Sequence, residues 1–233
     1  GNDGTMAAYS IHRSQKVVAP SEFITDGTYE DCAVDIDDIY VVVKRTINSS
    51  TKHYIERLDD DRTTDASFQL FDGSADGNKP TSTTVSGLTH LEGKTVECVR
   101  DDIFLGEKTV SSGQITIDQV PTTYVEIGLH HDVLAKTLPA EPRLASGTMV
   151  GRKKRIVAVS PVLNQTQNIA INGNEVSLKQ FPYTLDSSET LFTGRKRVTP
   201  LLGYSEEAQI SITQTKPLFF TLLSLEYSVS GSQ

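Results

Sequence analysis

Short runs of β-branched residues, each ended by a turn-forming cluster, constrain the fold of this chain more than any other feature. Residues 39–43 form one such run, residues 48–50 form a turn, and residues 51–58 follow with partial alternation. Valine, isoleucine and threonine are stiff at χ1 and fit a pleated strand better than a helix. The pattern predicts a β-hairpin, preceded by strands at residues 8–13 and 28–34.

A second group of short strands follows a very polar stretch at residues 59–66, where we place a domain junction. Turns at Glu92-Gly93, Leu105-Gly106 and Ser112-Gly113 separate these strands. Regular spacing of short strands is typical of a small barrel or sandwich. The predicted strands lie at 84–85, 95–100, 108–110, 114–117 and 123–129.

Pro139, Pro142 and Gly147 mark a second junction, because proline fixes φ and lacks the N–H that a helix or central strand needs. Residues 130–137 form the one stretch with a helical prediction, of about two turns. Beyond the junction, strands are predicted at 156–162, 175–178, 209–213 and 218–225.

The fold class predicted from these patterns is all-β. We expect an N-terminal β-hairpin region over residues 1–62, which is the end of an upstream β domain if the chain is a fragment. A small β-barrel or sandwich then covers 63–138, followed by a second, C-terminal β-sandwich over 139–233.

Charge is distributed unevenly along the chain. The net charge is -8, and residues 1–120 hold 21 of the 30 acidic and 11 of the 22 basic residues. An acidic first half disfavours general nucleic-acid binding. No run approaches the roughly 20 apolar residues that span a bilayer, so we expect no membrane insertion.

The two cysteines, Cys32 and Cys98, lie far apart and belong to no CxxC pair. A small secreted scaffold is normally richer in cysteine. We therefore expect both thiols to be reduced and buried. Cys98 lies inside a strand pattern, which is a poor position for an exposed, reactive thiolate.

Three groups of residues are candidates for metal binding or acid–base chemistry. Residues 72–78 resemble the opening of a calcium loop, but Thr83 stands where a bidentate glutamate is needed, so a flexible turn is the prediction and weak calcium binding is left open. His130 and His131 are adjacent, and adjacent strand residues point to opposite faces. The carboxylate pairs Asp37-Asp38 and Asp101-Asp102 fall at predicted turns.

No motif for nucleophilic, phosphate-binding or zinc-dependent chemistry is found in the sequence. We therefore predict a protein that is not an enzyme, with no cofactor and no resident metal. Solvation is the simplest explanation for the paired carboxylates, and a structural or surface role is the simplest for the histidines.

Two basic clusters remain as candidate contact residues. They are Arg152, Lys153, Lys154 and Arg155, and Arg195, Lys196 and Arg197. Each cluster borders a predicted strand, so alternate side chains can project to one face and attract phosphate. Two interpretations stay open, which are a solvated or subunit-pairing patch and contact with a nucleic-acid backbone. Few aromatic residues lie nearby, which argues against base stacking.

Seven segments carry a likeness to a known family, and they occur in the same order along the chain: 8–13, 38–48, 54–58, 87–96, 151–156, 191–194 and 210–218. Together they resemble the C-terminal half of bacteriophage tail proteins known as tail nozzle, tail tubular protein B or packaged-DNA stabilisation proteins. The likeness extends over residues 8 to about 229.

This resemblance implies a structural virion component, assembled in the bacterial host cytoplasm, that contributes to DNA retention or ejection. It also implies other tail subunits as partners, a homo-oligomeric ring, and transient contact with the DNA backbone. Such relatives are usually longer, with a propeller-like β region upstream, and they offer no catalytic residues to transfer.

Two alternative functions come from other classes of protein. A carbohydrate-binding or host-attachment β-module is one, because small β-sandwiches often present ligand loops, although the absence of tryptophan weakens it. A hydrolase with a nonstandard site is the other, and we expect no turnover on esterase, glycosidase and peptidase substrates.

Overall fold

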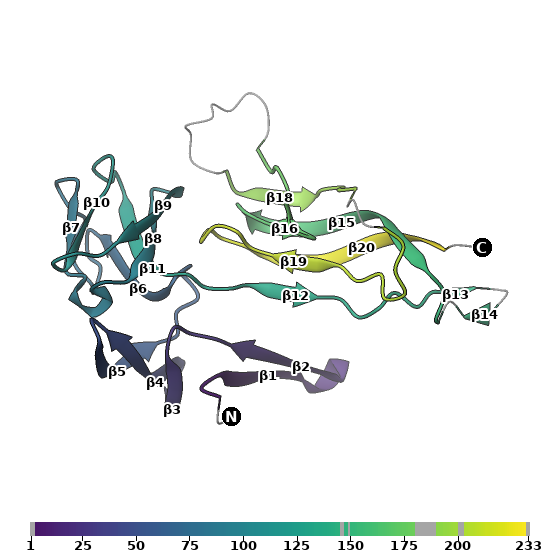
Figure 1. Cartoon of the computed structure of the whole chain (residues 1–233), viewed down its shortest axis with the longest axis horizontal. Helices are drawn as coiled ribbons and strands as arrows, with labels where there is room; N and C mark the ends of the chain where they lie inside the picture. Colours follow the sequence, from purple (N-terminus) through teal and green to yellow (C-terminus); the bar gives the residue numbers. More distant parts are fainter. Residues whose placement is uncertain (1–2, 145–146, 149, 180–189, 200–202, 232–233) are drawn as a thin grey trace. The chain divides into compact units, whose positions relative to one another are not determined.

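The computed structural model describes residues 3–144, 147–148, 150–179, 190–199 and 203–231, and it is built almost entirely from antiparallel strands. The chain divides into two compact units, residues 1–131 and 132–233, which are described separately (Figure 1). The expected three-part division stays a prediction, and its first junction, at residues 59–66, lies inside the first unit.

The first unit begins with a two-stranded hairpin and a three-stranded sheet. The hairpin pairs β1 with β2, and the sheet has the order β3-β4-β5. Asn48 and Ser49 have positive φ and form the turn between β4 and β5, which confirms the predicted hairpin. The strands are β1 (Met6–His12), β2 (Val17–Phe23), β3 (Thr28–Asp35), β4 (Asp38–Ile47) and β5 (Ser50–Arg57).

A four-stranded sheet, of order β6-β11-β8-β9, and a pair of short strands, β7 and β10, complete the first unit. The sheets in the described part of the chain stay open rather than closing into a barrel, so the sandwich alternative describes them better. The strands are β6 (Asp65–Phe71), β7 (Thr84–Ser86), β8 (Thr95–Arg100), β9 (Ile103–Thr109), β10 (Gln114–Thr116) and β11 (Tyr124–Leu129).

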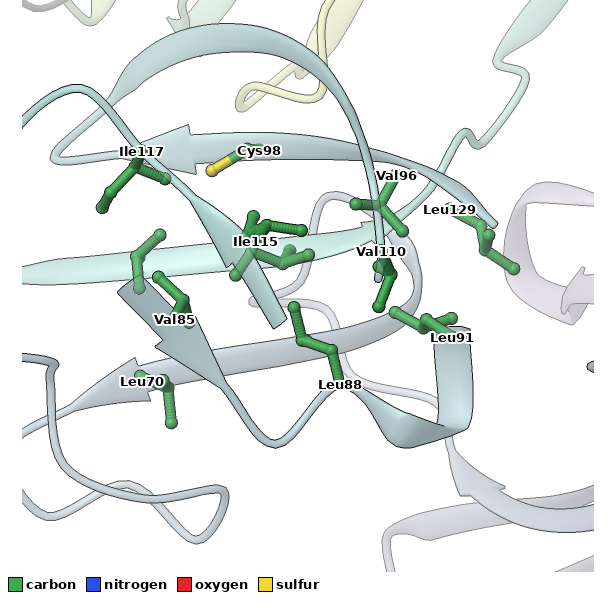
Figure 2. Close-up of a cluster of buried hydrophobic side chains, with 12 residues drawn as sticks. Leu70, Val85, Leu88, Leu91, Val96, Cys98, Val110, Ile115, Ile117 and Leu129 are labelled. Atoms are coloured by element: carbon green, nitrogen blue, oxygen red, sulfur yellow. The ribbon is translucent and has the colours of Figure 1, made fainter. Parts of the chain in front are cut away.

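A hydrophobic core fills the space between these two sheets. It includes Val85 and Ile115 from the small pair, Val96 and Cys98 from β8, and Leu91 from a short 3-10 helix at Thr89–Leu91. Figure 2 shows these side chains converging, with the sulfur of Cys98 inside the cluster. Alternating apolar side chains on facing strands therefore produce the core that the sequence pattern predicts.

The second unit has its own core and two main sheets, of order β18-β15-β20 and β12-β19-β16-β17, with a small β13-β14 pair. Its strands are β12 (Leu134–Lys136), β13 (Arg143–Leu144), β14 (Gly147–Thr148), β15 (Lys154–Thr166), β16 (Ala170–Ile171), β17 (Asn174–Glu175), β18 (Phe192–Arg195), β19 (Ser211–Thr213) and β20 (Leu222–Gly231).

The helix predicted over residues 130–137 is wrong. Residues 134–136 form β12, which pairs with β19 so that Ala135 lies opposite Ile212. Two helical turns are marginal in water without tertiary support, whereas pairing with β19 gives the same backbone groups partners. None of the helices in the described part of the chain is long and apolar enough to cross a membrane.

Candidate nucleic-acid or subunit interface

The two basic clusters lie near one edge of β15 in the second unit. At this edge, which we call the seam, β15 pairs with β18 and with the segment that follows β18. Val162 of β15 pairs with Arg195, Val159 bridges to Val198, and Lys154 bridges to Ser205. About six residues of β15 separate the clusters, which is roughly 20 Å along a strand. The structure therefore places the first cluster at the start of β15 and the second cluster beside the middle of β15.

Lys154 differs from its neighbours because its side chain is 0% exposed. Its Nζ lies 2.6 Å from Oε1 of Glu141, and its backbone N–H and C=O both pair with Ser205. Alternation along β15 turns Lys154 inward together with Ile156. The prediction of Lys154 as a contact residue is therefore wrong, because a buried ammonium cannot reach a phosphate backbone.

The outward-facing members of the first cluster are Arg152, Lys153 and Arg155, all of which are exposed. The guanidinium of Arg155 lies over the ring of Tyr204, 5.5 Å from its centroid, in cation–π geometry. The ring holds the arginine in place while leaving its outer N–H groups accessible to water or an anion.

In the second cluster, Arg195 and Arg197 are exposed and Lys196 between them is half-buried. Arg195 forms an exposed ion pair with Glu226 of β20. The backbone N–H of Lys196 donates to the carbonyl of Pro161, which fixes this segment against β15. Arg195 is therefore partly neutralised within its own sheet, and Arg197 is the more available cation.

Acidic side chains further reduce the net positive charge along the seam. Glu141 pairs with Lys154, Glu226 pairs with Arg195, and the exposed Glu206 directly follows the residue that bridges to Lys154. Opposite charges interspersed at this spacing weaken the local positive potential. The arrangement can hold an anionic backbone loosely, and it can equally pair with an acidic neighbouring surface.

A buried charge in the first unit was missed by the sequence patterns. The Arg45 side chain is 1% exposed, and its guanidinium donates to both oxygens of Glu56 at 2.8 and 2.7 Å. It also donates to both oxygens of Asp65, at 2.9 and 3.1 Å, and to the carbonyl of Asp26 at 2.9 Å. Burial would lower the pKa of Arg45, but the hydrogen bonds that its guanidinium donates to Glu56 and Asp65 outweigh burial and raise the pKa.

A second buried charge, the carboxylate of Glu126 on β11, is held by neutral donors. Its Oε1 accepts from the backbone N–H groups of Thr63 and Thr64, at 2.8 and 2.9 Å, and from both threonine hydroxyls. Its Oε2 accepts from the amide of Gln69 at 3.3 Å. These bonds attach the segment before β6 to the middle of the neighbouring strand.

Most of the remaining candidates for chemistry make contacts within the fold. In the calcium-like loop, Asp72 pairs with Lys79, while Asp76 lies 3.4 Å from Arg62 and accepts from the N–H of Gln69. Across the described residues, no group of three or more histidine, cysteine, aspartate or glutamate side chains is placed to hold a metal ion.

Members of the histidine pair and of one carboxylate pair also make contacts within the fold. Nδ1 of His130 lies 3.0 Å from Oε1 of Glu97. Asp101 occupies the β8–β9 turn with positive φ and accepts from the N–H groups of Thr122, Thr123 and Tyr124. Burial would raise the pKa of Asp101, but these N–H donors outweigh it and lower the pKa. Asp101 thus joins this turn to the start of β11.

Cys32 corrects another expectation, because it is exposed, whereas Cys98 is buried as predicted. β3 protrudes beyond Tyr29, and its residues from 30 onward are exposed on both faces. Burial raises the pKa of the Cys98 thiol to about 12.

We expect maleimide at neutral pH to modify Cys32 alone in the native chain, because the thiolate is the reactive form and Cys98 is both buried and protonated. Mass spectrometry should find one label per native chain and a second after denaturation. A Cys32→Ser variant serves as the control and should take up no label until it unfolds. Rapid labelling of Cys98 in the native chain would contradict this placement.

No protein-family model matches the sequence, and a search of curated proteins finds no match.

Proposed function

We propose that this chain is a structural component of a bacteriophage tail, of the nozzle or tail-tube type. It resides in the virion, assembles in the host cytoplasm, contacts other tail subunits in a homo-oligomeric ring and contributes to DNA retention or ejection. The ordered sequence likeness over residues 8 to about 229 supports this assignment.

The observation that carries the proposal is that each of three buried charged side chains joins two separate parts of the chain. Arg45 joins β4 and β5 to the start of β6, and Glu126 joins β11 to the segment before β6. In the second unit, Lys154 joins β15 to Glu141. Each charge fixes one part of the chain against another, which suits a protein whose task is mechanical, since a conduit wall must keep its shape under load.

The distribution of exposed charge supports the same function. The outer side of the β15–β18 seam presents a few cations, chiefly Arg152, Arg155 and Arg197, among acidic neighbours. DNA that passes through a conduit must not adhere strongly to its wall. Few phosphate contacts produce weak, salt-sensitive binding, which satisfies that requirement.

The test is to locate the chain in particles. Antibodies against the folded chain should label one end of purified virions of the encoding phage in immuno-electron microscopy, and mass spectrometry of the same particles should detect its peptides. An antibody against the phage's major capsid protein is the control for particle integrity. Intact, infectious virions that lack the chain would refute the proposed function.

A second expectation concerns DNA. The full chain should bind duplex DNA weakly at low salt, and a double Arg152→Ala, Arg155→Ala variant should reduce the slope of log K against log salt by about 2, since each lost phosphate contact removes about 0.9. Fluorescence anisotropy at several salt concentrations measures this slope. The matched control is Lys44→Ala with Lys52→Ala, which removes two exposed cations of the first unit. Equal effects of the two double variants would contradict a contact at the seam.

A further inference from the structure

The β1–β2 hairpin, which we call the arm, is attached to the first unit at its base. The N–H of Tyr29 donates to the carbonyl of Gly4 at 2.9 Å, and a Cβ at Gly4 would lie 2.5 Å from Cγ2 of Thr28. Beyond this attachment, every residue from 9 to 22 is exposed. An isolated two-stranded hairpin is only marginally stable in water, so the arm needs a surface to pack against.

The strand register gives the arm one apolar face. Tyr9 pairs with Pro20 and Ile11 pairs with Val18, so these four side chains share a face. Tyr9, Ile11 and Val18 are each 63–64% exposed. The pairs on the opposite face are smaller and more polar, such as Ala8 with Ser21 and Ser10 with Ala19. The tip of the arm carries two exposed cations, Arg13 and Lys16.

The far end of the β3–β4 hairpin, which we call the acidic tip, has the complementary character. Val34 pairs with Ile39, and their exposed fractions are 68% and 40%, while Ile36 at the turn is 89% exposed. Alternation places Ile39 on the same face of β4 as the buried Val41, so an apolar face continues beyond the part that the unit covers. The exposed acids of the acidic tip are Asp31, Asp35 and Asp37.

Within one copy of the chain, the arm and the acidic tip leave each other uncovered, because residues 9–22 and 30–37 are all exposed. A basic end with an apolar face and an acidic end with an apolar face on the same molecule are complementary between copies. We propose that the arm of one copy packs its Tyr9–Ile11–Val18 face on the acidic tip of a second copy, with Arg13 and Lys16 close to Asp35 and Asp37.

This contact is heterologous, since it joins two different surfaces, and a contact of that kind generates a ring when its rotation closes. It rests on the proposed function for the idea that copies assemble, and it adds which surfaces meet. Its apolar part holds the copies together, and the paired charges fix the direction in which each arm points.

A disulfide trap in the full chain tests the contact directly. Cys32 is exposed and lies two residues from Val34 on β3, while Cys98 is buried. In an Ile11→Cys variant, copper-phenanthroline oxidation should join the new thiol to Cys32 of another copy, producing cross-linked chains on a non-reducing gel. The control is Ile55→Cys, a position on β5 that is 78% exposed and outside both surfaces, which should cross-link far less.

Charge reversal supplies the second readout. Arg13→Glu with Lys16→Glu, or Asp35→Lys with Asp37→Lys, should each weaken self-association at least about tenfold in analytical ultracentrifugation. An equimolar mixture of the two reversed variants should associate again, because in an alternating assembly each reversed arm meets a reversed tip and each unchanged arm meets an unchanged tip. Combining the four changes in one chain should restore association as well. Recovery in the fourfold variant is the result that a merely structural role of these residues would not produce.

Three outcomes would overturn the contact. A chain that stays monomeric up to about 100 μM, or one whose association ignores both reversals, rules it out. Cross-linking of Ile11→Cys that persists in a Cys32→Ser background shows that arms pair with arms instead. These results are separate from the particle test, because a chain found in virions that assembles through other surfaces would refute the arm contact alone.

Discussion

Replacing Arg45 with alanine is expected to lower the free energy of unfolding of the first unit by about 3–5 kcal/mol, because it leaves two carboxylates without their cation in a buried setting. The guanidinium makes five hydrogen bonds, to Glu56, to Asp65 and to the carbonyl of Asp26. Urea unfolding followed by circular dichroism, with hydrogen exchange of the β4 and β5 amides, measures the change.

Two further variants define what the Arg45 result means. Arg45→Lys keeps the charge but cannot reproduce the planar, forked pattern of donors, so it should recover less than half of the lost stability. Arg57→Ala removes an exposed arginine on the adjacent strand that pairs with Asp38 and Asp59, and it should leave the unfolding midpoint nearly unchanged. Similar shifts for Arg45→Ala and Arg57→Ala would contradict a structural role for the buried network.

The position of Arg45 explains why sequence patterns missed it. Val41, Val43 and Ile47 are buried on one face of β4, and Arg45 occupies the same phase of the alternation. A basic residue at an inward-facing position of a strand indicates a buried charge that needs an acidic partner. The signal was present in the sequence, but the partners Glu56 and Asp65 become visible only once the strands are paired.

The same phase argument explains why two neighbouring residues of the first basic cluster differ in exposure. Lys154 shares the inward phase of Ile156, whereas Arg155 points outward with Val157. Grouping residues 152–155 by composition combined Lys154 and Arg155, whose side chains lie on opposite faces of β15. The acidic partner Glu141, 13 positions away, was beyond any local pattern.

Several strand positions were well predicted, because turn residues and β-branched runs act locally, whereas β2 and β6 were not predicted. The hairpin at residues 39–58 and the strand at 95–100 agree closely with β4, β5 and β8. The local pattern does not show which strand surfaces other elements of the fold will bury. Residues 28–34 are a strand whichever surface lies against them, so the exposure of Cys32 and of the arm follows only from how far each strand extends beyond the packed core.

Replacing Lys154 with alanine is expected to lower the free energy of unfolding of the second unit by about 2–4 kcal/mol, through loss of the buried stem and of the Glu141 ion pair. Lys154→Met keeps most of the stem and removes only the charge, so its loss should be smaller than that of alanine. Urea unfolding with hydrogen exchange of the β15 amides measures both.

The informative comparison for Lys154 is with Arg155, its outward-facing neighbour. Lys154→Met should leave the salt dependence of DNA binding unchanged, because its ammonium is 0% exposed and never reaches a phosphate. Arg155→Ala should do the reverse and weaken DNA binding with little loss of stability, since that side chain is exposed and stacks on Tyr204. If Lys154→Met reduced the salt slope while unfolding stayed as in the unmodified chain, Lys154 would be a contact residue after all. If Lys154→Met changed only stability and Arg155→Ala changed only DNA binding, the DNA contacts of the seam would be limited to its outward-facing arginines.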